Sequence, residues 1–293
     1  MFSVNKFMKR NKYIDEQKVI EFYKSKNIKE IAEELNTYDE KIRQILIKNG
    51  IERKTKFKGW KKVNDAFFDN IDNEEKAYIL GFFIADGCIR LEKDKNGEIT
   101  HSRLAFSNSV DDEEIINRIH TLICPENKIQ YIHNTSDGSK RKPQLSLQWT
   151  SKHMKDILTE KYKIMPRKTY DDTFEIPENV IPNELFRHFV RGFIDGDGTI
   201  NNGDIRFVFN SKPFAIQIIN FFKNEFDKNK KLVEEFSYTL KEIEGKTVKY
   251  YRLRLPTGKG RKKLYESIIY DDATIFLKRK RTLLHKEKKE VEK

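Results

Sequence analysis

The sequence predicts an α+β protein made of two similar halves, preceded by a small all-α helix-turn-helix module. An apolar motif that ends in aspartate and glycine occurs twice, 111 residues apart. The polar and apolar patterns that follow each copy repeat in the same order, and residues 15–51 contain three short amphipathic segments. The 293 residues suit this division because one domain typically spans roughly 100–200 residues.

The composition favours a folded protein with a polyanionic partner. Apolar residues make up 37% of the chain, with 21 Phe and 12 Tyr, which is enough to build a core. The 58 basic residues exceed the 46 acidic ones, giving a net charge of +12. Such a surplus indicates nucleic acid most often and an anionic membrane sometimes, while a charge that serves solubility alone is the alternative.

Several classes of protein are excluded by the same sequence. The two cysteines, Cys88 and Cys124, cannot build a disulfide framework, and their spacing is not that of a zinc site. The N-terminal residues lack the apolar stretch of a signal peptide. The longest apolar run covers 77–85, about half of a membrane crossing. We therefore expect an intracellular protein without a membrane partner, in the cytoplasm of a bacterium or phage-infected cell or in an organelle, and not a secreted one.

Residues 1–51 are predicted to form the helix-turn-helix module that binds DNA. Asn36, Thr37 and Tyr38 link the second and third helical segments. Asparagine tolerates the left-handed conformation that such a turn needs, and Thr37 can cap the next helix. A three-helix bundle with a solvated face is the alternative. The third helix is expected to read DNA through its outward side chains, which include Tyr38, Lys41, Arg43, Gln44 and Lys48.

Two charged segments flank the predicted domains. Residues 52–64 are interpreted as a basic linker that follows the phosphate backbone, because 52–62 hold six basic residues and one acid. A merely solvated linker is the alternative. Residues 286–293 are interpreted as a charged tail.

The duplicated region divides into a first half over 65–176 and a second half over 177–285. Three later segments also repeat: 106–109 with 208–211, 145–149 with 251–255, and 167–169 with 279–281. Asp86 precedes Lys168 by 82 residues, and Asp197 precedes Lys280 by 83. Each half is predicted to contain a helix, two strands, a helix, two strands and a helix, with a hairpin turn near Gly97 in the first half.

The motif helices are predicted to pack against each other. Their apolar character indicates burial. Gly81 with Ala85, and Gly192 with Gly196, place small residues four positions apart on one helical face. That spacing lets two helix backbones approach closely.

Asp86 and Asp197 then stand at the ends of the two packed helices. Each is followed by a glycine that can end a helix with a positive φ. A carboxylate at the negative end of a helix dipole is unfavourable, and two carboxylates close together repel each other. A hard divalent cation such as Mg²⁺ relieves both conflicts, using the carboxylates and the helix-end carbonyls as ligands. Such ions suit in-line attack by water on a phosphodiester.

Other known motifs fit the sequence poorly. Read as a calcium-binding EF-hand loop, the second copy has Phe193 at the first position and Asp204 at the twelfth. The chain has no phosphate-binding loop of the Gly-Lys-Ser/Thr type, and its six histidines form no HxxxH pair.

The motif pair resembles the LAGLIDADG homing endonucleases in their single-chain, two-motif form. The copies ILGFFIADG (79–87) and VRGFIDGDG (190–198) carry this resemblance, which covers about 65–285. It implies αββαββα repeats whose four-stranded antiparallel sheets form a saddle over DNA. It also implies a double-strand break in a long target, in intron homing, by a monomer that uses Mg²⁺, with Mn²⁺ as an alternative ion.

The resemblance carries site roles to particular residues. The metal ligands it implies are Asp86 and Asp197 with the carbonyls of Ala85 and Gly196. The first copy departs from the family pattern at Ile84, which we expect to lie within the helix. The basic residue near the scissile phosphate corresponds to Lys168 in the first half and Lys280 in the second, with Lys278 as a rival. Candidates for positioning water are Asn108 and Asn210, which strand-end roles would explain equally well.

Polar side chains that alternate along the strands are expected to face the DNA, where Arg and Gln read base edges. The solvated side of a sheet is the alternative for this set, which comprises Arg103, Gln144, Gln148, Arg206, Arg252 and Arg254.

A binding module on the same scaffold is the alternative to a nuclease. It would be an intron RNA maturase, with RNA as its partner, or a non-cleaving DNA-binding regulator. Both acids are present, which favours the nuclease. An intein is excluded because residue 1 is not Cys or Ser and the chain does not end in His-Asn.

Overall fold

The computed structural model describes residues 13–26, 28–51, 62–133, 142–201, 204–225, 235–243, 245–256 and 261–285. Residues 52–61 of the predicted linker over 52–64 lie outside the described residues, and so does the charged tail over 286–293. The chain divides into two units, Met1–Trp60 and Lys61–Lys293. Among the described helices, none has the length and apolar character needed to cross a membrane.

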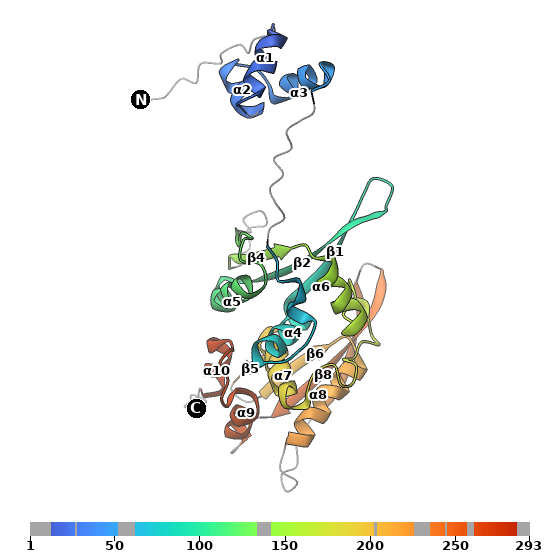
Figure 1. The fold of residues 1–293 in the computed structure, drawn as a ribbon. Coiled ribbons are helices and arrows are strands. Elements are labelled where there is room, and N and C mark those ends of the chain that lie inside the picture. The colour runs from blue at the N-terminus through green and yellow to red at the C-terminus, as the bar shows by residue number, and fades with distance from the viewer. Residues whose placement is uncertain are drawn as a thin grey trace, which may run out of the picture. The chain divides into compact units, whose positions relative to one another are not determined.

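The first unit contains three short helices, α1 (Glu16–Tyr23), α2 (Ile28–Glu34) and α3 (Asp39–Lys48) (Figure 1). The Asp15 carboxylate caps α1 by accepting hydrogen bonds from the main-chain nitrogens of Gln17 and Lys18. Asn36 has φ of 48°, the left-handed conformation expected for this turn. The helices enclose a small core of their own, which includes Val19, Tyr23, Ile31, Ile42, Ile45 and Leu46.

The predicted capping role of Thr37 was wrong. Tyr38 occupies the N-cap position of α3 and makes no side-chain capping bond. The Thr37 side chain is buried, and its hydroxyl has no hydrogen-bond partner among the described residues. The helix therefore starts one residue later than the Thr37 cap required.

The second unit contains the predicted order of elements twice. The first half comprises α4 (Glu74–Asp86), β1 (Gly87–Lys93), β2 (Ile99–Ser109), α5 (Glu113–Ile123), β3 (Gln130–Ile132), β4 (Gln144–Trp149) and α6 (Lys152–Asp156). The second comprises α7 (Asn183–Asp197), β5 (Thr199–Asn201), β6 (Asp204–Phe209), α8 (Lys212–Glu225), β7 (Glu235–Ile243), β8 (Lys246–Pro256) and α9 (Arg261–Tyr270). A further helix, α10 (Lys278–His285), follows the second half.

Each half folds its strands into one four-stranded antiparallel sheet, which confirms the predicted fold class. The strand orders are β1-β2-β4-β3 and β5-β6-β8-β7, so the two sheets have the same topology. Helices α5 and α6 pack on the first sheet and α8 packs on the second (Figure 1). Along β6 the buried side chains of Ile205, Phe207 and Phe209 alternate with exposed Arg206 and Val208, as one buried sheet face requires.

Helices α4 and α7 pack side by side between the sheets (Figure 1). A β-carbon on Gly81 would overlap the carbonyl oxygen of Phe189, and one on Gly192 would overlap that of Tyr78. A β-carbon on Gly196 would overlap the β-carbon of Ala85. The small residues are therefore required by the contact between the two backbones, as the spacing predicted.

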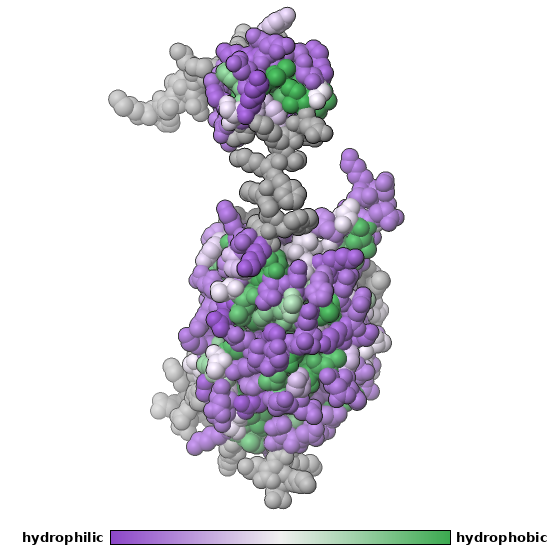
Figure 2. All heavy atoms as spheres, viewed as in Figure 1, coloured by the Kyte–Doolittle hydropathy of each residue, from purple (hydrophilic) through white to green (hydrophobic). Residues whose placement is uncertain are grey.

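On the surface seen in Figure 2, hydrophilic residues predominate and hydrophobic residues gather in patches between them.

Candidate active site at the ends of the paired helices

The last residues of α4 and α7 are Asp86 and Asp197. Each is followed by a glycine that begins a strand or leads into one. The expected positive φ was wrong, because Gly87 has φ of −73° and Gly198 has φ of −70°. Glycine is required here by space: a β-carbon on Gly87 would overlap the Phe83 ring, and one on Gly198 would overlap the Ile194 carbonyl oxygen.

The Asp86 carboxylate has a hydrogen-bond donor within its own half. The Asn108 side-chain nitrogen donates to Asp86 Oδ2 at 2.6 Å. Asn108 is 5% exposed, and its Oδ1 has no partner among the described residues. Burial raises the pKa of Asp86, while the Asn108 hydrogen bond and the nearby Lys168 ammonium partly offset this rise. A buried acceptor without a partner next to a carboxylate suits a site that takes a cation or an ordered water.

The Asp197 side chain is more exposed than that of Asp86, and it lacks a hydrogen bond like the one from Asn108 to Asp86. Its side chain reaches solvent, and no described residue donates a hydrogen bond to it. Desolvation by the surrounding protein, and then repulsion by the Asp86 carboxylate, raise the pKa of Asp197 to about 6. The two acids are thus close enough to interact electrostatically, as the packing of their helices predicted.

Lys168 begins a 3₁₀ turn over Lys168–Tyr170, and its side chain reaches the C-terminal end of α4. Its ammonium donates to the carbonyl oxygens of Phe83 at 3.0 Å and Ala85 at 2.9 Å, and also to that of Ile84. Burial lowers the pKa of Lys168 to about 8, against the opposing influence of Asp197 and Asp86. A positive charge at a helix C-terminus is stabilised by the helix dipole.

Lys280 occupies the corresponding place at the end of α7. It lies in the first turn of α10, and its ammonium donates to the carbonyl oxygens of Ile194 and Gly198. Burial lowers its pKa, and so does the neighbouring Arg279. Lys278, the rival residue, instead forms an ion pair with Glu114 at 2.9 Å. Lys280 is therefore the lysine at this helix end.

Asn108 and Asn210 are not equivalent, although the sequence segments align them. Gly87 pairs with Phe106, whereas the pairing of Thr199 with Arg206 places Gly198 opposite Phe207. Phe106 of β2 therefore corresponds to Phe207 of β6. Two residues further along these strands, Asn108 corresponds to Phe209 and not to Asn210. Asn210 follows β6 and donates to the main-chain oxygens of Lys168 and Asp171. It therefore holds the turn that carries Lys168 instead of contacting an acid.

The oxygen atoms at the helix ends suit a hard divalent cation. No cluster of three or more His, Cys, Asp or Glu side chains with metal-site geometry occurs among the described residues. Ligands would therefore come from the two carboxylates, main-chain carbonyls, water and substrate, an all-oxygen set of the kind Mg²⁺ prefers. The Ala85 carbonyl is at present bonded to Lys168.

A cavity of about 290 Å³ opens beside the second acid. Its walls are largely apolar, with Phe193, Phe209 and Phe214 among them. Asp197 and Lys168 also line it. The Asp197 carboxylate thus borders an apolar space, whereas the Asp86 carboxylate borders an amide.

The polar strand residues lie where alternation placed them. On the first sheet, Arg103 Nη1 donates to Gln148 Oε1 at 3.1 Å, and Gln144 accepts a weak hydrogen bond from the Ser107 hydroxyl. On the second sheet, Arg206 and Arg254 are paired neighbours. Both contact the buried Asp204 carboxylate, at 2.6 and 2.9 Å. Arg252 is exposed on the same face. Two of these arginines are thus held in place by an acid.

In the first unit, the predicted DNA-reading side chains of α3 lie toward solvent. Tyr38 is 60% exposed, and Lys41, Gln44 and Lys48 are exposed. Arg43 pairs with Glu40, and Lys48 pairs with Glu16.

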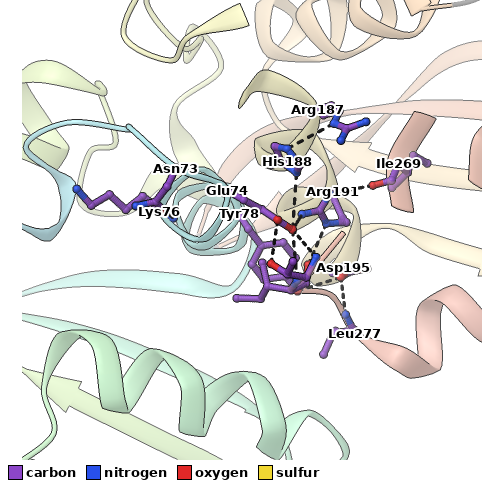
Figure 3. A network of polar contacts seen from close by, with 12 residues as sticks. Asn73, Glu74, Lys76, Tyr78, Arg187, His188, Arg191, Asp195, Ile269 and Leu277 are labelled. Atoms are coloured by element: carbon purple, nitrogen blue, oxygen red, sulfur yellow. Dashed lines mark hydrogen bonds and ion pairs between the residues drawn. The ribbon is translucent and has the colours of Figure 1, made fainter. Parts of the chain in front are cut away.

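A buried polar network around Asp195, which lies two residues before Asp197 on α7, was not predicted from the sequence (Figure 3). Asp195 accepts hydrogen bonds from the hydroxyls of Tyr78 and Tyr270 and from the main-chain nitrogen of Leu277. Its side chain is fully buried. Burial raises the pKa of Asp195 to about 6 despite these three hydrogen bonds. The network joins α4, α7 and the segment between α9 and α10.

Arg191 and Glu74 extend this network (Figure 3). The fully buried Arg191 pairs with Glu74 Oε1 at 2.5 Å and donates to the main-chain oxygens of Ile269 and Ile275. Glu74 also accepts from Thr274. The position of Arg191 inside an apolar helix was the one sign of this network in the sequence. Nothing in the sequence identified its partner Glu74, which lies 117 residues away.

Comparison with known proteins gives a structural likeness only. No protein-family profile matches the chain, and no curated protein matches it. Solved structures of homing endonucleases are similar to it. Variants of the homing endonuclease I-DmoI are 14% identical, cover 69% of this chain and 98% of their own, and have a TM-score of 0.38.

Two further structures are comparable. The homing endonuclease I-WcaI bound to its DNA recognition sequence is 13% identical, with coverage of 72% and 87% and a TM-score of 0.42. I-SmaMI bound to an uncleaved DNA target with calcium ions is 12% identical, with coverage of 67% and 84% and a TM-score of 0.37. Likeness this weak says nothing of the function of this chain.

Proposed function

We propose that this chain is a site-specific homing endonuclease of the LAGLIDADG type, which makes a double-strand break in DNA by metal-dependent hydrolysis. One observation carries the proposal. Asp86 and Asp197 end two closely packed helices, interact electrostatically, and are flanked by Lys168 and Lys280. Acids paired in this way at the negative ends of helices suit a divalent cation, and the net charge of +12 suits a DNA substrate.

The residues of the site have separate tasks in this proposal. Asp86 and Asp197, with the carbonyls of Ala85 and Gly196, would hold Mg²⁺ or Mn²⁺. The ion supplies a Lewis acid that lowers the pKa of bound water and stabilises charge on the phosphate. The ammonium groups of Lys168 and Lys280 neutralise negative charge that builds up near the helix ends.

The polar sheet faces would bind the duplex. Arg and Gln side chains on β2, β4, β6 and β8 can reach base edges, and α3 of the first unit would add contacts in a major groove. Two acids within one chain provide one carboxylate for each DNA strand, so a monomer suffices for a double-strand break.

The test begins by finding the target. Cleaved sites are selected from a randomised duplex library with Mg²⁺, and the selected duplex is then assayed with Asp86→Asn, Asp197→Asn and the double variant. Each single change is expected to slow double-strand cleavage roughly a thousandfold, since metal stabilisation of the transition state is worth several kcal/mol. DNA affinity is expected to stay near that of the wild type, because the change removes only the metal ligand.

Asp271→Asn is the matched control, since Asp271 is an exposed acid that follows α9 and lies outside the site formed by Asp86, Asp197, Lys168 and Lys280. Full cleavage by the double variant contradicts the proposal. Stimulation of intron splicing without cleavage of an intronless target would assign the chain as an RNA maturase. Specific DNA binding without either activity would assign it as a regulator.

A further inference from the structure

We propose that Asp112, in the first half, positions the Lys280 ammonium of the second half, and that it acts through Arg279. This inference rests on the proposed nuclease function, in which Lys280 neutralises charge at the end of α7. It adds a positioning residue from the opposite half of the chain.

The first step concerns the start of α10, which consists of four consecutive basic residues over 278–281. Positive charges in the first turn of a helix face the positive end of the helix dipole, and at such short distances they also repel each other. A helix of eight residues is, in addition, marginal in water when it is isolated. The first turn of α10 therefore depends on contacts with the rest of the fold to stay in place.

The second step concerns the partners of these bases, which lie on different elements. Lys278 pairs with Glu114 on α5 at 2.9 Å. Arg281 pairs with Glu266 on α9 at 2.6 Å. Lys280 is 7% exposed and donates to main-chain oxygens at the end of α7. Each of these bases has a different neighbour, so the position of the turn decides whether Lys280 reaches α7.

The third step concerns Arg279, which directly precedes Lys280. Its Nε atom donates to Asp112 Oδ1 at 2.6 Å, and its Nη2 atom donates to Asp112 Oδ2 at 2.8 Å. Two parallel hydrogen bonds between a guanidinium and a carboxylate fix orientation as well as distance. Asp112 is 3% exposed and ends the 3₁₀ turn Val110–Asp112 that follows β2, so packing holds its carboxylate. The first half thereby holds the turn of α10 from which the Lys280 side chain extends.

The fourth step concerns the charges around Lys280. Burial and then the Arg279 guanidinium lower the pKa of Lys280, which indicates that the two cations lie close together. Asp112 acts on the pKa of Lys280 in the opposite direction. The carboxylate therefore offsets the repulsion between two neighbouring cations while it holds one of them.

The lysine of the first half is also supported from the opposite half. Asn210, which follows β6, donates to the main-chain oxygens of Lys168 and Asp171. In both directions, a residue just after the second strand of one half thus holds the lysine-bearing segment of the other. This correspondence favours a positioning role for Asp112 over an incidental ion pair.

The experiment uses the full chain and the duplex selected above. Single-turnover rate constants are measured with Mg²⁺, at enzyme concentrations that saturate the duplex, for the wild type, Asp112→Asn, Lys280→Met and the double variant. Asp112→Asn is expected to slow cleavage roughly 10- to 100-fold, the effect of displacing a reacting group by about 1 Å. Lys280→Met is expected to slow cleavage at least as much.

The double variant separates positioning from general support of the fold. In the Lys280→Met background, Asp112→Asn should slow cleavage hardly any further, because residues that act as a unit have non-additive effects. A merely structural role would slow cleavage by the same factor in both backgrounds. DNA affinity without Mg²⁺ should stay near that of the wild type in all variants.

Glu114→Gln is the matched control. It removes an ion pair that also joins the first half to α10, but the side chains of that pair are 68% and 71% exposed. Exposed pairs contribute little, so this variant should cleave at the wild-type rate. Thermal unfolding shows whether Asp112→Asn remains folded. If it does not, Arg279→Lys takes its place, because lysine keeps the charge but cannot form the two parallel bonds.

Three outcomes overturn the inference and leave the nuclease intact. They are a wild-type rate for Asp112→Asn, a wild-type rate for Lys280→Met, and an equal loss from Asp112→Asn with and without Lys280. Failure of the wild type to cut any selected duplex would instead overturn the proposed function.

Discussion

At the scale of single residues, Asp195 is a fully buried acid that accepts three hydrogen bonds. It shares a helix with Asp197 but points away from the candidate site, into the network formed with Tyr78 and Tyr270. A fully buried carboxylate is costly unless donors satisfy it, and this one has three. It therefore contributes to the join between the two halves and not to the chemistry.

Asp195 should make the folded protein lose stability as the pH rises. Burial raises its folded-state pKa to about 6, above an unfolded value of about 3.9. A carboxyl group with a raised folded-state pKa favours folding fully below pH 4, and this contribution is lost as the pH rises through 6. Its loss amounts to roughly 3 kcal/mol of unfolding free energy for a shift of this size.

Urea unfolding at several pH values between 4 and 7 measures this effect. Asp195→Asn removes the titrating group, so its unfolding free energy should fall less steeply over that range than that of the wild type. Asp271→Asn should follow the wild type. Parallel curves for all three proteins would show that Asp195 does not titrate as the structure indicates.

Single residues also show where sequence reasoning succeeds. Asp86 and Asp197 could be placed together because a repeated motif on two packed helices leaves little freedom. For Asn210 the strand-end alternative holds, because Asn210 follows β6 and bonds to main-chain oxygens. Aligned letters could not decide this, since they do not reveal a shift in strand register, which moves side chains to other positions. Glu74 was missed because its partner, Arg191, comes from the other half of the chain.

At the scale of elements, the contact between α4 and α7 allows a sharp test. Helix propensity alone predicts that Gly192→Ala stabilises the protein by about 1 kcal/mol. The structure instead predicts that Gly192→Ala destabilises the protein, because the new β-carbon would overlap the Tyr78 carbonyl oxygen. Separating the two helices should cost roughly 1–3 kcal/mol or more, as in other overpacked cores.

Thermal and urea unfolding of Gly192→Ala provide the measurement. Asn224→Ala, at an exposed position of α8, is the control for replacing a residue by alanine in a helix. A gain in stability for Gly192→Ala would mean that the helices lie further apart than the structure shows. A loss would be accompanied by weaker cleavage, because the two acids are carried on these helices.

Other elements were predictable to different degrees. The duplicated pattern predicted both sheets and their helices, since apolar periodicity reflects which face is buried. The start of α3 was misjudged at Thr37 because a capping residue depends on local backbone angles that composition does not determine. Lys280 was predicted from a repeated basic segment, but only the fold of α10 shows why it reaches the end of α7 and Lys278 does not.

At the scale of the whole molecule, the positive charge is unevenly distributed. Residues 1–60 contain fifteen basic and nine acidic residues, so a fifth of the chain carries half of the net charge of +12. These residues form a unit of their own, with a separate apolar core. The predicted DNA-binding role of this unit can therefore be tested by removing it.

Deleting residues 1–60 should weaken DNA binding without unfolding the rest. The second unit keeps its own core and both acids, so its thermal unfolding should be little changed. Each phosphate contact that is lost lowers the slope of log affinity against log salt by about 0.9, because fewer counterions are released. The deletion should therefore flatten this slope, which is measured by titrating labelled target duplex at several salt concentrations. Charge-neutralising changes at Lys41 and Lys48 in the full chain should flatten it in the same direction but less. An unchanged affinity at every salt concentration would show that the three helices serve another purpose than holding DNA.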